Sequence, residues 1–166
     1  MDRKLRKLLD ECTNDIVMQY QIAGITPATV RNYIISEMAT AISGRDWEAS
    51  RTLLAMTRIV EDSEVKADVL NNLLVTPGHE LHQEVTMEIQ RLKSPSSVSY
   101  IRSVLTGGFG FLVYTGSDDE VIAKWFSHAL AEIGTAEAIE VIKEFCADDN
   151  AGIAEEMRYR VKKLAI

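Results

Sequence analysis

The sequence has few of the residues that cross-link, break or bend a chain. Among 166 residues there are two cysteines, three prolines and nine glycines. Cys12 and Cys146 lie far apart, each within an apolar helical pattern, so two buried thiols in a reducing compartment are expected rather than a disulfide framework. The scarcity of proline and glycine favours long helices over many short strands.

Long hydrophobic runs are also missing. No stretch approaches the roughly 18 apolar residues that a membrane-spanning helix requires. The chain begins with a basic cluster, Arg3, Lys4, Arg6 and Lys7, but its first twenty residues contain no continuous apolar core of signal-peptide length. We therefore expect a cytoplasmic protein that has no membrane partner.

What the sequence does contain is a large share of apolar residues and good helix formers. Hydrophobic residues make up 46% of the chain, enough for one domain with a sizeable core. Apolar residues recur at helical spacing in the first half, with Thr26 as the expected N-cap of the second helix. The pattern predicts helices over residues 2–22, 27–43, 46–60 and 63–75.

After residue 78 one apolar pattern occurs three times. Its members are separated by steps of four, four and three residues. The second copy lies 41 residues after the first, and the third copy lies 31 residues after the second. The turn residues Ser94 and Thr135 share the offset of 41. Such periods indicate stacked helix hairpins with a shared core, whereas the alternative is an ordinary antiparallel bundle. The copies are Leu81, Val85, Ile89, Leu92; Ile122, Phe126, Leu130, Ile133; and Ile153, Met157, Val161, Leu164.

The predicted fold is all-α, a right-handed α-solenoid of about eight or nine helices in antiparallel hairpins that forms a single domain over 1–166. Residues 1–78 are expected to be degenerate repeats, and 79–164 clear repeats with an insert at 106–117. Because Phe109 and Leu112 continue the apolar stripe of the preceding helix, packing of the insert against the stack is favoured over an aromatic contact surface.

Three stretches carry a family resemblance: LKSPSSVSYI at 92–101, HALAEIGTAEAI at 128–139, and the closing Asp148-Asp149. With them the region from His79 to Leu164 resembles bacterial HEAT-repeat proteins. The layout is also similar to small HEAT-like immunity proteins found beside bacterial polymorphic toxins. That resemblance implies a cytosolic, often acidic protein that binds a toxin domain directly.

The charge is unbalanced. Eighteen basic and 25 acidic residues give a net charge of −7, which repels nucleic-acid phosphates, so no nucleic-acid partner is expected. Between residues 118 and 156, eleven acids stand against two lysines, a local balance of −9. We expect this acidic helical surface to dock another protein, such as a basic toxin domain.

The candidate protein-binding residues lie in and just after the insert. The three consecutive acids resemble a helix start, where the helix dipole favours negative charge. Trp125 would anchor an interface if exposed, although packing at the edge of the core is its more common use. His128 lies outside the apolar stripe and fits a partly exposed position. The candidate set is Tyr114, Asp118, Asp119, Glu120, Trp125 and His128.

No catalytic, cofactor or metal site is predicted. His79 and His82 could share a metal ion with a nearby glutamate, but no HExxH motif or third ligand is evident, so surface or capping roles are favoured. The glycines of Gly107-Gly108-x-Gly110 follow a helix and form no phosphate loop. Cys146 occupies a core-like position without a neighbouring base.

The leading functional hypothesis is non-catalytic protein binding, with toxin neutralisation as its specific form. A scaffold or accessory subunit of a larger complex fits the same residues. A HEAT-like alkylpurine DNA glycosylase would share the architecture, but such enzymes use a cationic groove that the acidic middle of this chain disfavours. The sequence does not indicate an oligomeric state.

Overall fold

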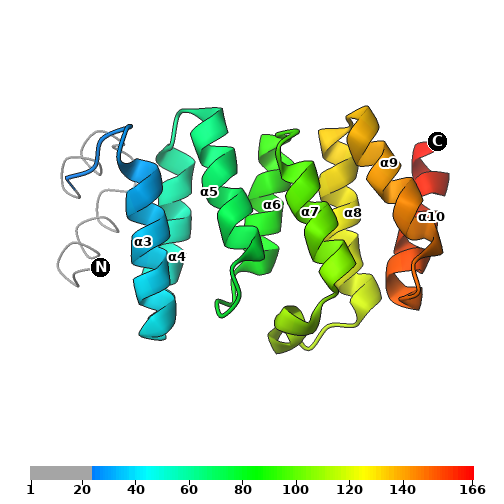
Figure 1. Ribbon diagram of the computed structural model, residues 1–166, viewed down its shortest axis with the longest axis horizontal. Coiled ribbons are helices and arrows are strands. Elements are labelled where there is room, and N and C mark those ends of the chain that lie inside the picture. Colours follow the sequence, from blue (N-terminus) through cyan, green and yellow to red (C-terminus); the bar gives the residue numbers. More distant parts are fainter. Residues whose placement is uncertain (1–23) are drawn as a thin grey trace. The chain divides into compact units, whose positions relative to one another are not determined.

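The computed structural model describes residues 24–166, and the helix expected over 2–22 lies outside this range. Within it the chain forms eight α-helices and three short 3-10 segments, without a strand (Figure 1). The all-α prediction is therefore confirmed for the described part of the chain. The protein divides into two compact units, residues 1–73 and 74–166, and the dividing point lies inside helix α5 (Ser63–Val75).

Unit 1 contains two contacting helices, α3 (Val30–Ser43) and α4 (Trp47–Met56). The expected N-cap of α3 at Thr26 is wrong by three residues, since Thr29 occupies that position. The carbonyl of Thr26 accepts hydrogen bonds from the N–H groups of Thr29 and Val30 and so closes a separate turn ahead of the helix. The apolar stripe of α3 is buried as expected, with Val30, Ile34, Met38 and Ala41 facing inward.

The helix expected over 46–60 forms as two elements, α4 and the 3-10 turn η1 (Thr57–Ile59). The side chain of Asp46 starts α4 by accepting a hydrogen bond from the N–H of Ala49 at 3.0 Å, as an N-cap does. The buried hydroxyl of Thr57 donates to the carbonyl of Leu54 at 2.7 Å where the α-helix gives way to the tighter turn. The following helix, α5, has the predicted bounds.

Unit 2 consists of five helices in two layers. Helix α8 (Asp119–Ile133) contacts α6 (His82–Leu92) and α10 (Ala151–Leu164), and α7 (Ser97–Gly107) contacts α9 (Ala136–Glu144) in the other layer (Figure 1). The 3-10 segments η2 (Gly110–Thr115) and η3 (Phe145–Ala147) follow α7 and α9.

Helices α6, α8 and α10 all begin at one end of unit 2, the lower end in Figure 1. Lys93 after α6 pairs with Glu132 in the last turn of α8. At the other end, Asn150 before α10 donates a hydrogen bond to Asp119 at the start of α8. The three helices of this layer are thus parallel. Charged residues at the helix starts therefore gather at one end of unit 2, and those at the helix ends gather at the other.

The repeated apolar pattern forms the core of unit 2. In the first two copies, the side chains at the first three positions are at most 5% exposed. The side chain at the last position of each copy, Leu92, Ile133 or Leu164, lies nearer the surface. The left-handed residues that end α6 and α8, Lys93 (φ 55°) and Gly134 (φ 66°), also lie 41 positions apart. Each is the C-cap residue of its helix. The N–H of Lys93 donates to the carbonyl of Ile89, and the N–H of Gly134 donates to the carbonyl of Leu130.

The insert expected at 106–117 folds against the stack, as its apolar residues predicted. Leu112 is fully buried and Phe109 is 7% exposed, and the ring of Phe109 stacks on Phe126 of α8 with centroids 5.8 Å apart. Val113 in the same segment remains 79% exposed. None of the helices between residues 24 and 166 is long and apolar enough to cross a membrane.

Candidate protein-binding edge

The three consecutive acids of the candidate set lie at the start of α8, all exposed. Asp118 is the N-cap residue, although its side chain makes no capping hydrogen bond, and Asp119 and Glu120 form the first turn. Asp119 also links two helices, because its carboxylate accepts a hydrogen bond from the side-chain amide of Asn150 at 2.6 Å. Of these three exposed acids, Asp119 therefore helps to hold α8 and α10 together, whereas within residues 24–166 the side chains of Asp118 and Glu120 make no such contact between helices.

The start of α10 adds two further acids to this end. Asn150 is its N-cap and accepts hydrogen bonds from the N–H groups of Gly152 and Ile153, and Asp148 and Asp149 come directly before it. The α8 backbone approaches closely here, since a Cβ on Gly152 would lie 2.7 Å from the amide nitrogen of Glu120. We call the five carboxylates Asp118, Asp119, Glu120, Asp148 and Asp149 the acidic edge.

The acidic edge keeps its negative charge despite the helix ends beside it. Each helix N-terminus contributes a partial charge of about +0.5, so the ends of α8 and α10 offset only about one of the five negative charges. The surrounding segments 103–123 and 144–157 contain no lysine or arginine. Sequence reasoning missed Asp148 and Asp149 as site residues; their position before a helix start was the available signal.

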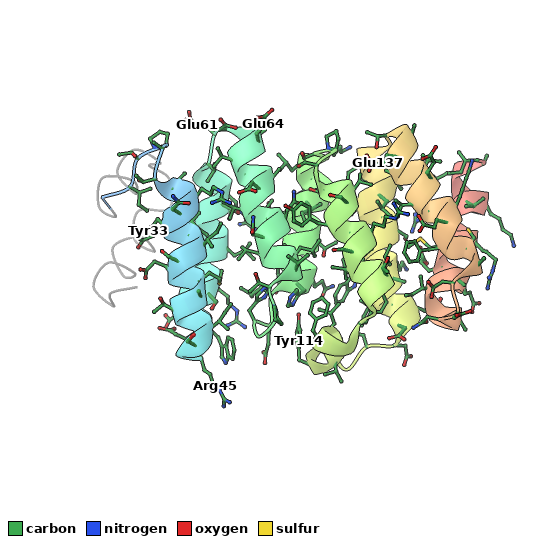
Figure 2. All side chains as sticks on the ribbon, in the orientation of Figure 1. Tyr33, Arg45, Glu61, Glu64, Tyr114 and Glu137 are labelled. Carbon is green, nitrogen blue, oxygen red and sulfur yellow. The ribbon has the colours of Figure 1, made fainter. Side chains whose placement is uncertain are left out.

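Tyr114 lies in η2, four residues before Asp118 in the chain, at the lower end of unit 2 in Figure 2. Its hydroxyl is 3.1 Å from Nδ1 and 3.2 Å from the backbone nitrogen of His82. The ring of Phe111 meets the His82 ring edge-on at 5.0 Å. Burial is the main cause that raises the pKa of Tyr114, and the carboxylates of Glu84 and Glu80 raise it further. The hydrogen bond from the backbone N–H of His82 acts in the opposite direction and lowers it.

The expectation that His79 and His82 lie at the surface is wrong, although His79 accepts a hydrogen bond from the backbone N–H of Leu81 directly before α6, in the manner of a capping side chain. His79 is 2% exposed and His82 is fully buried, and their rings stack with centroids 3.9 Å apart. The insert covers them, and the imidazoles exchange hydrogen bonds with Tyr114, Thr76 and the N–H of Leu81. Burial and the neighbouring His79 lower the pKa of His82 to about 3, so this imidazole is neutral at physiological pH.

The acidic stretch of 118–156 does not form one surface. Glu156 is buried and pairs with Arg160 of the same helix at 2.9 Å, and it accepts a hydrogen bond from the buried hydroxyl of Ser127. Glu132 pairs with Lys93 and Glu144 with Arg102. These three carboxylates are therefore balanced by cations and take no part in the acidic edge.

Trp125 and His128 lie on α8 away from the acidic edge, and both are half-buried. Burial lowers the pKa of His128, and the guanidinium of Arg160 lowers it further. Of the other candidate residues, Tyr114 lies in η2 and the three acids lie at the start of α8. Residues 24–166 contain no group of three His, Cys, Asp or Glu side chains placed to hold a metal ion. No protein-family model matches the chain, nor does any curated protein or solved structure.

Proposed function

We propose that this chain is a non-catalytic protein-binding protein whose residues 79–164 are HEAT-type repeats. The support for the repeats is physical: equal spacing of core residues, equal spacing of the left-handed caps, and parallel packing of α6, α8 and α10. Helix pairs of this kind bury their apolar faces only by stacking on neighbours. A right-handed solenoid is the arrangement we infer for them.

The binding proposal is supported by the acidic edge together with the exposed apolar turn that precedes α8 in the chain. Val113 is 79% exposed although both its neighbours in the chain, Leu112 and Tyr114, are fixed by packing and hydrogen bonding. An apolar side chain held in place at the rim of a charged surface is a low-entropy contact for a partner. The matching partner surface is basic with an apolar recess at its border.

A basic toxin domain fits that description, and we propose neutralisation of such a domain by direct binding as the biological role. Opposite charges on the two proteins accelerate encounter, since electrostatic steering raises association rates by about ten- to a thousand-fold. An inhibitor that must act before its target does damage benefits from that speed. The acidic edge supplies the steering, and the Val113 turn supplies contact area.

The test requires a basic toxin domain as the partner, to be sought among the proteins encoded beside this chain. Its association rate would be measured by stopped-flow fluorescence for the natural protein and for Asp118→Lys/Glu120→Lys. Both positions are exposed and outside the Asp119–Asn150 contact, so the fold is expected to persist. We expect the association rate to fall about tenfold at low salt, with a smaller loss at high salt.

A matched control carries the same charge change elsewhere. Glu137→Lys/Glu140→Lys alters two exposed acids on α9, and Glu137 lies at the opposite end of unit 2 from Tyr114 (Figure 2). The control variant should associate at nearly the natural rate. Equal slowing in both variants would show that only net charge matters, and unchanged rates in both would remove the acidic edge from the interface.

A scaffold and an inhibitor differ in what happens to the bound partner. If the complex forms and the toxic activity of the partner disappears at equimolar ratio, the protein is an inhibitor. Full activity of the partner within a stable complex would instead assign this chain to a scaffold or accessory role.

A further inference from the structure

A hollow of about 320 Å³ opens on the surface of unit 2 between α6 and α8, near the ends of these two contacting helices. Residues from both helices and from the turn after α6 line it: Met87, Gln90, Arg91, Lys93 and Glu132. The ion pair between Lys93 and Glu132 crosses from the end of α6 to α8 at this place. Glu132 therefore marks the side of α8 that faces α6.

Helical spacing identifies the other residues on that side of α8. Trp125 precedes Glu132 by seven residues, or about two turns, and Val121 precedes Trp125 by four. Both therefore lie on the side that faces α6. Ser127 marks the opposite side, because its hydroxyl bonds to Glu156 of α10.

A strip of uncharged side chains thus runs along the junction of α6 and α8. Met87 and Val121 are 44% and 47% exposed, and Gln90 and Trp125 are half-buried. His128, three residues after Trp125, is mainly neutral at physiological pH because burial lowers its pKa. We call these five residues the α6–α8 strip.

Charges of opposite sign lie along the two long sides of the strip. Glu84 is 41 residues before Trp125, at the equivalent position of the preceding helix, and Glu80 is four residues earlier. Because Trp125 faces the helix before its own, both acids face away from α8, and both are exposed. Lys124, exposed on α8, precedes Ser127 by three residues and is turned toward α10. The strip therefore has acids on its α6 side and a lysine on its α10 side.

A helix fits this strip better than an extended segment does. The backbone groups of α6 and α8 bond within their own helices, so a strand laid on them would find no edge to pair with. A helix satisfies its own backbone groups and packs side chains at i, i+4 and i+7 between those of its neighbours. Helix α6 has 11 residues and α8 has 15, so about three to four turns cover the strip.

We propose that the α6–α8 strip docks an amphipathic helix of a partner protein, with the apolar face of that helix on the strip. The side of the helix above α6 is basic, opposite Glu80 and Glu84, and the side toward α10 is acidic, opposite Lys124. The strip shares no residue with the acidic edge, and the proposal does not depend on the toxin-binding role. Because the contact is small, an isolated helical peptide is expected to bind with a Kd on the order of 10–100 µM.

The probe for this docking is a synthetic helical peptide of about 15 residues, with leucines along one face, lysines on one side of that face and glutamates on the other. Trp125 reports its binding once the other tryptophan is removed by Trp47→Phe. Because the peptide shields Trp125 from water, the emission is expected to shift to shorter wavelength and to saturate. A peptide of the same composition with alternating leucines, the pattern of a strand, should leave the emission unchanged.

Met87→Ser should weaken peptide binding about tenfold, because it removes an apolar contact from the strip. Tyr159→Ser is the matched control, since this side chain is 50% exposed on α10 and lies outside the strip; the affinity should stay unchanged. Asp118→Lys/Glu120→Lys, which alters the acidic edge, should also bind the peptide with nearly the natural affinity. Circular dichroism melting checks that each variant is folded.

A charge exchange tests the orientation of the helix. Glu80→Lys/Glu84→Lys sets lysines against the basic side of the peptide and should weaken binding about tenfold. A second peptide, with glutamates on both sides of its leucines, should bind this variant about tenfold more tightly than it binds the natural protein. Glu137→Lys/Glu140→Lys makes the same change of net charge on α9 and should keep the natural preference for the first peptide.

Four results would overturn the proposal. The first is an unchanged Trp125 emission up to about 1 mM peptide, and the second is equal binding of the peptide with alternating leucines. The third is a charge exchange that leaves the ranking of the two peptides as it is in the natural protein. The fourth is loss of binding in Asp118→Lys/Glu120→Lys, which would place the peptide on the acidic edge. Failure of the toxin-binding test would leave these outcomes unaffected, since that test alters no residue of the strip.

Discussion

Tyr114 and His82 exchange hydrogen bonds in both directions. The Nε2 of His82 lies 3.0 Å from the carbonyl oxygen of Thr76, so this nitrogen carries the ring proton and Nδ1 is an acceptor. The hydroxyl of Tyr114 donates to Nδ1 at 3.1 Å and accepts from the backbone N–H of His82 at 3.2 Å. One hydroxyl thus connects the insert to the first turn of α6.

Tyr114→Phe is expected to destabilise the protein by about 1–3 kcal/mol, because it leaves two polar groups of the buried His82 without a partner. The phenyl ring keeps the packing, so the loss reports the hydroxyl alone. Urea unfolding followed by circular dichroism measures it. Tyr100→Phe is the control, since within the described residues the hydroxyl of this half-buried tyrosine makes no hydrogen bond. Equal losses in the two variants would contradict the assignment.

The pKa of His82 predicts a stability change with pH. Its folded-state value of about 3 lies below the ordinary 6.5, so the folded protein favours the neutral ring. That stabilisation is complete above pH 6.5 and is lost as the pH falls toward 3, with a slope of up to about 1.4 kcal/mol per pH unit. Comparison with His82→Gln isolates the effect from the carboxylates. If the unfolding free energies of the natural protein and of His82→Gln changed with pH in parallel, the predicted contribution of His82 would be refuted.

Much of the helical architecture follows from local spacing. The bounds of α5, the burial of the α3 stripe and the packing of Phe109 and Leu112 were predictable because each depends on which residues share one helix face or continue it. The burial of His79 and His82 was not, since it depends on η2, which lies about 30 residues later in the chain. Local sequence around a histidine does not report that a distant segment covers it.

The candidate site was only partly predictable for a related reason. A run of acids in sequence distributes over three helices, and each helix turns some side chains inward. Glu156 faces Arg160 in the interior, whereas Asp118 and Glu120 reach solvent. The four-residue spacing of Glu156 and Arg160 was a usable signal for an ion pair, but not for its burial.

The buried pair of Glu156 and Arg160 gives the third prediction. Arg160→Met should cost about 3–5 kcal/mol in unfolding free energy, because it leaves the carboxylate of Glu156 buried without its cation. Replacing both residues by Met should recover most of that loss. Arg102→Met removes the exposed pair with Glu144 and should cost less than about 1 kcal/mol. A double variant no more stable than Arg160→Met would argue against this account.

Gly152 in the first turn of α10 supplies the last prediction, because there helix propensity and packing oppose each other. Alanine favours a helix over glycine by about 1 kcal/mol, so an isolated α10 would gain from Gly152→Ala. In the protein, however, the added Cβ would lie 2.7 Å from the amide nitrogen of Glu120 and 3.1 Å from the Cβ of Asp119. Backbone cannot rotate away as a flexible side chain can, so α8 and α10 must separate.

We therefore expect Gly152→Ala to lower the unfolding free energy by about 1–3 kcal/mol. Gly107→Ala is the matched comparison, since this glycine lies in the last turn of α7 and its added Cβ would meet nothing within 4 Å. That variant should be neutral or more stable by up to about 1 kcal/mol. Opposite signs in urea unfolding would establish the close approach of α8 and α10, whereas stabilisation by both substitutions would show that the two helices are not in contact there.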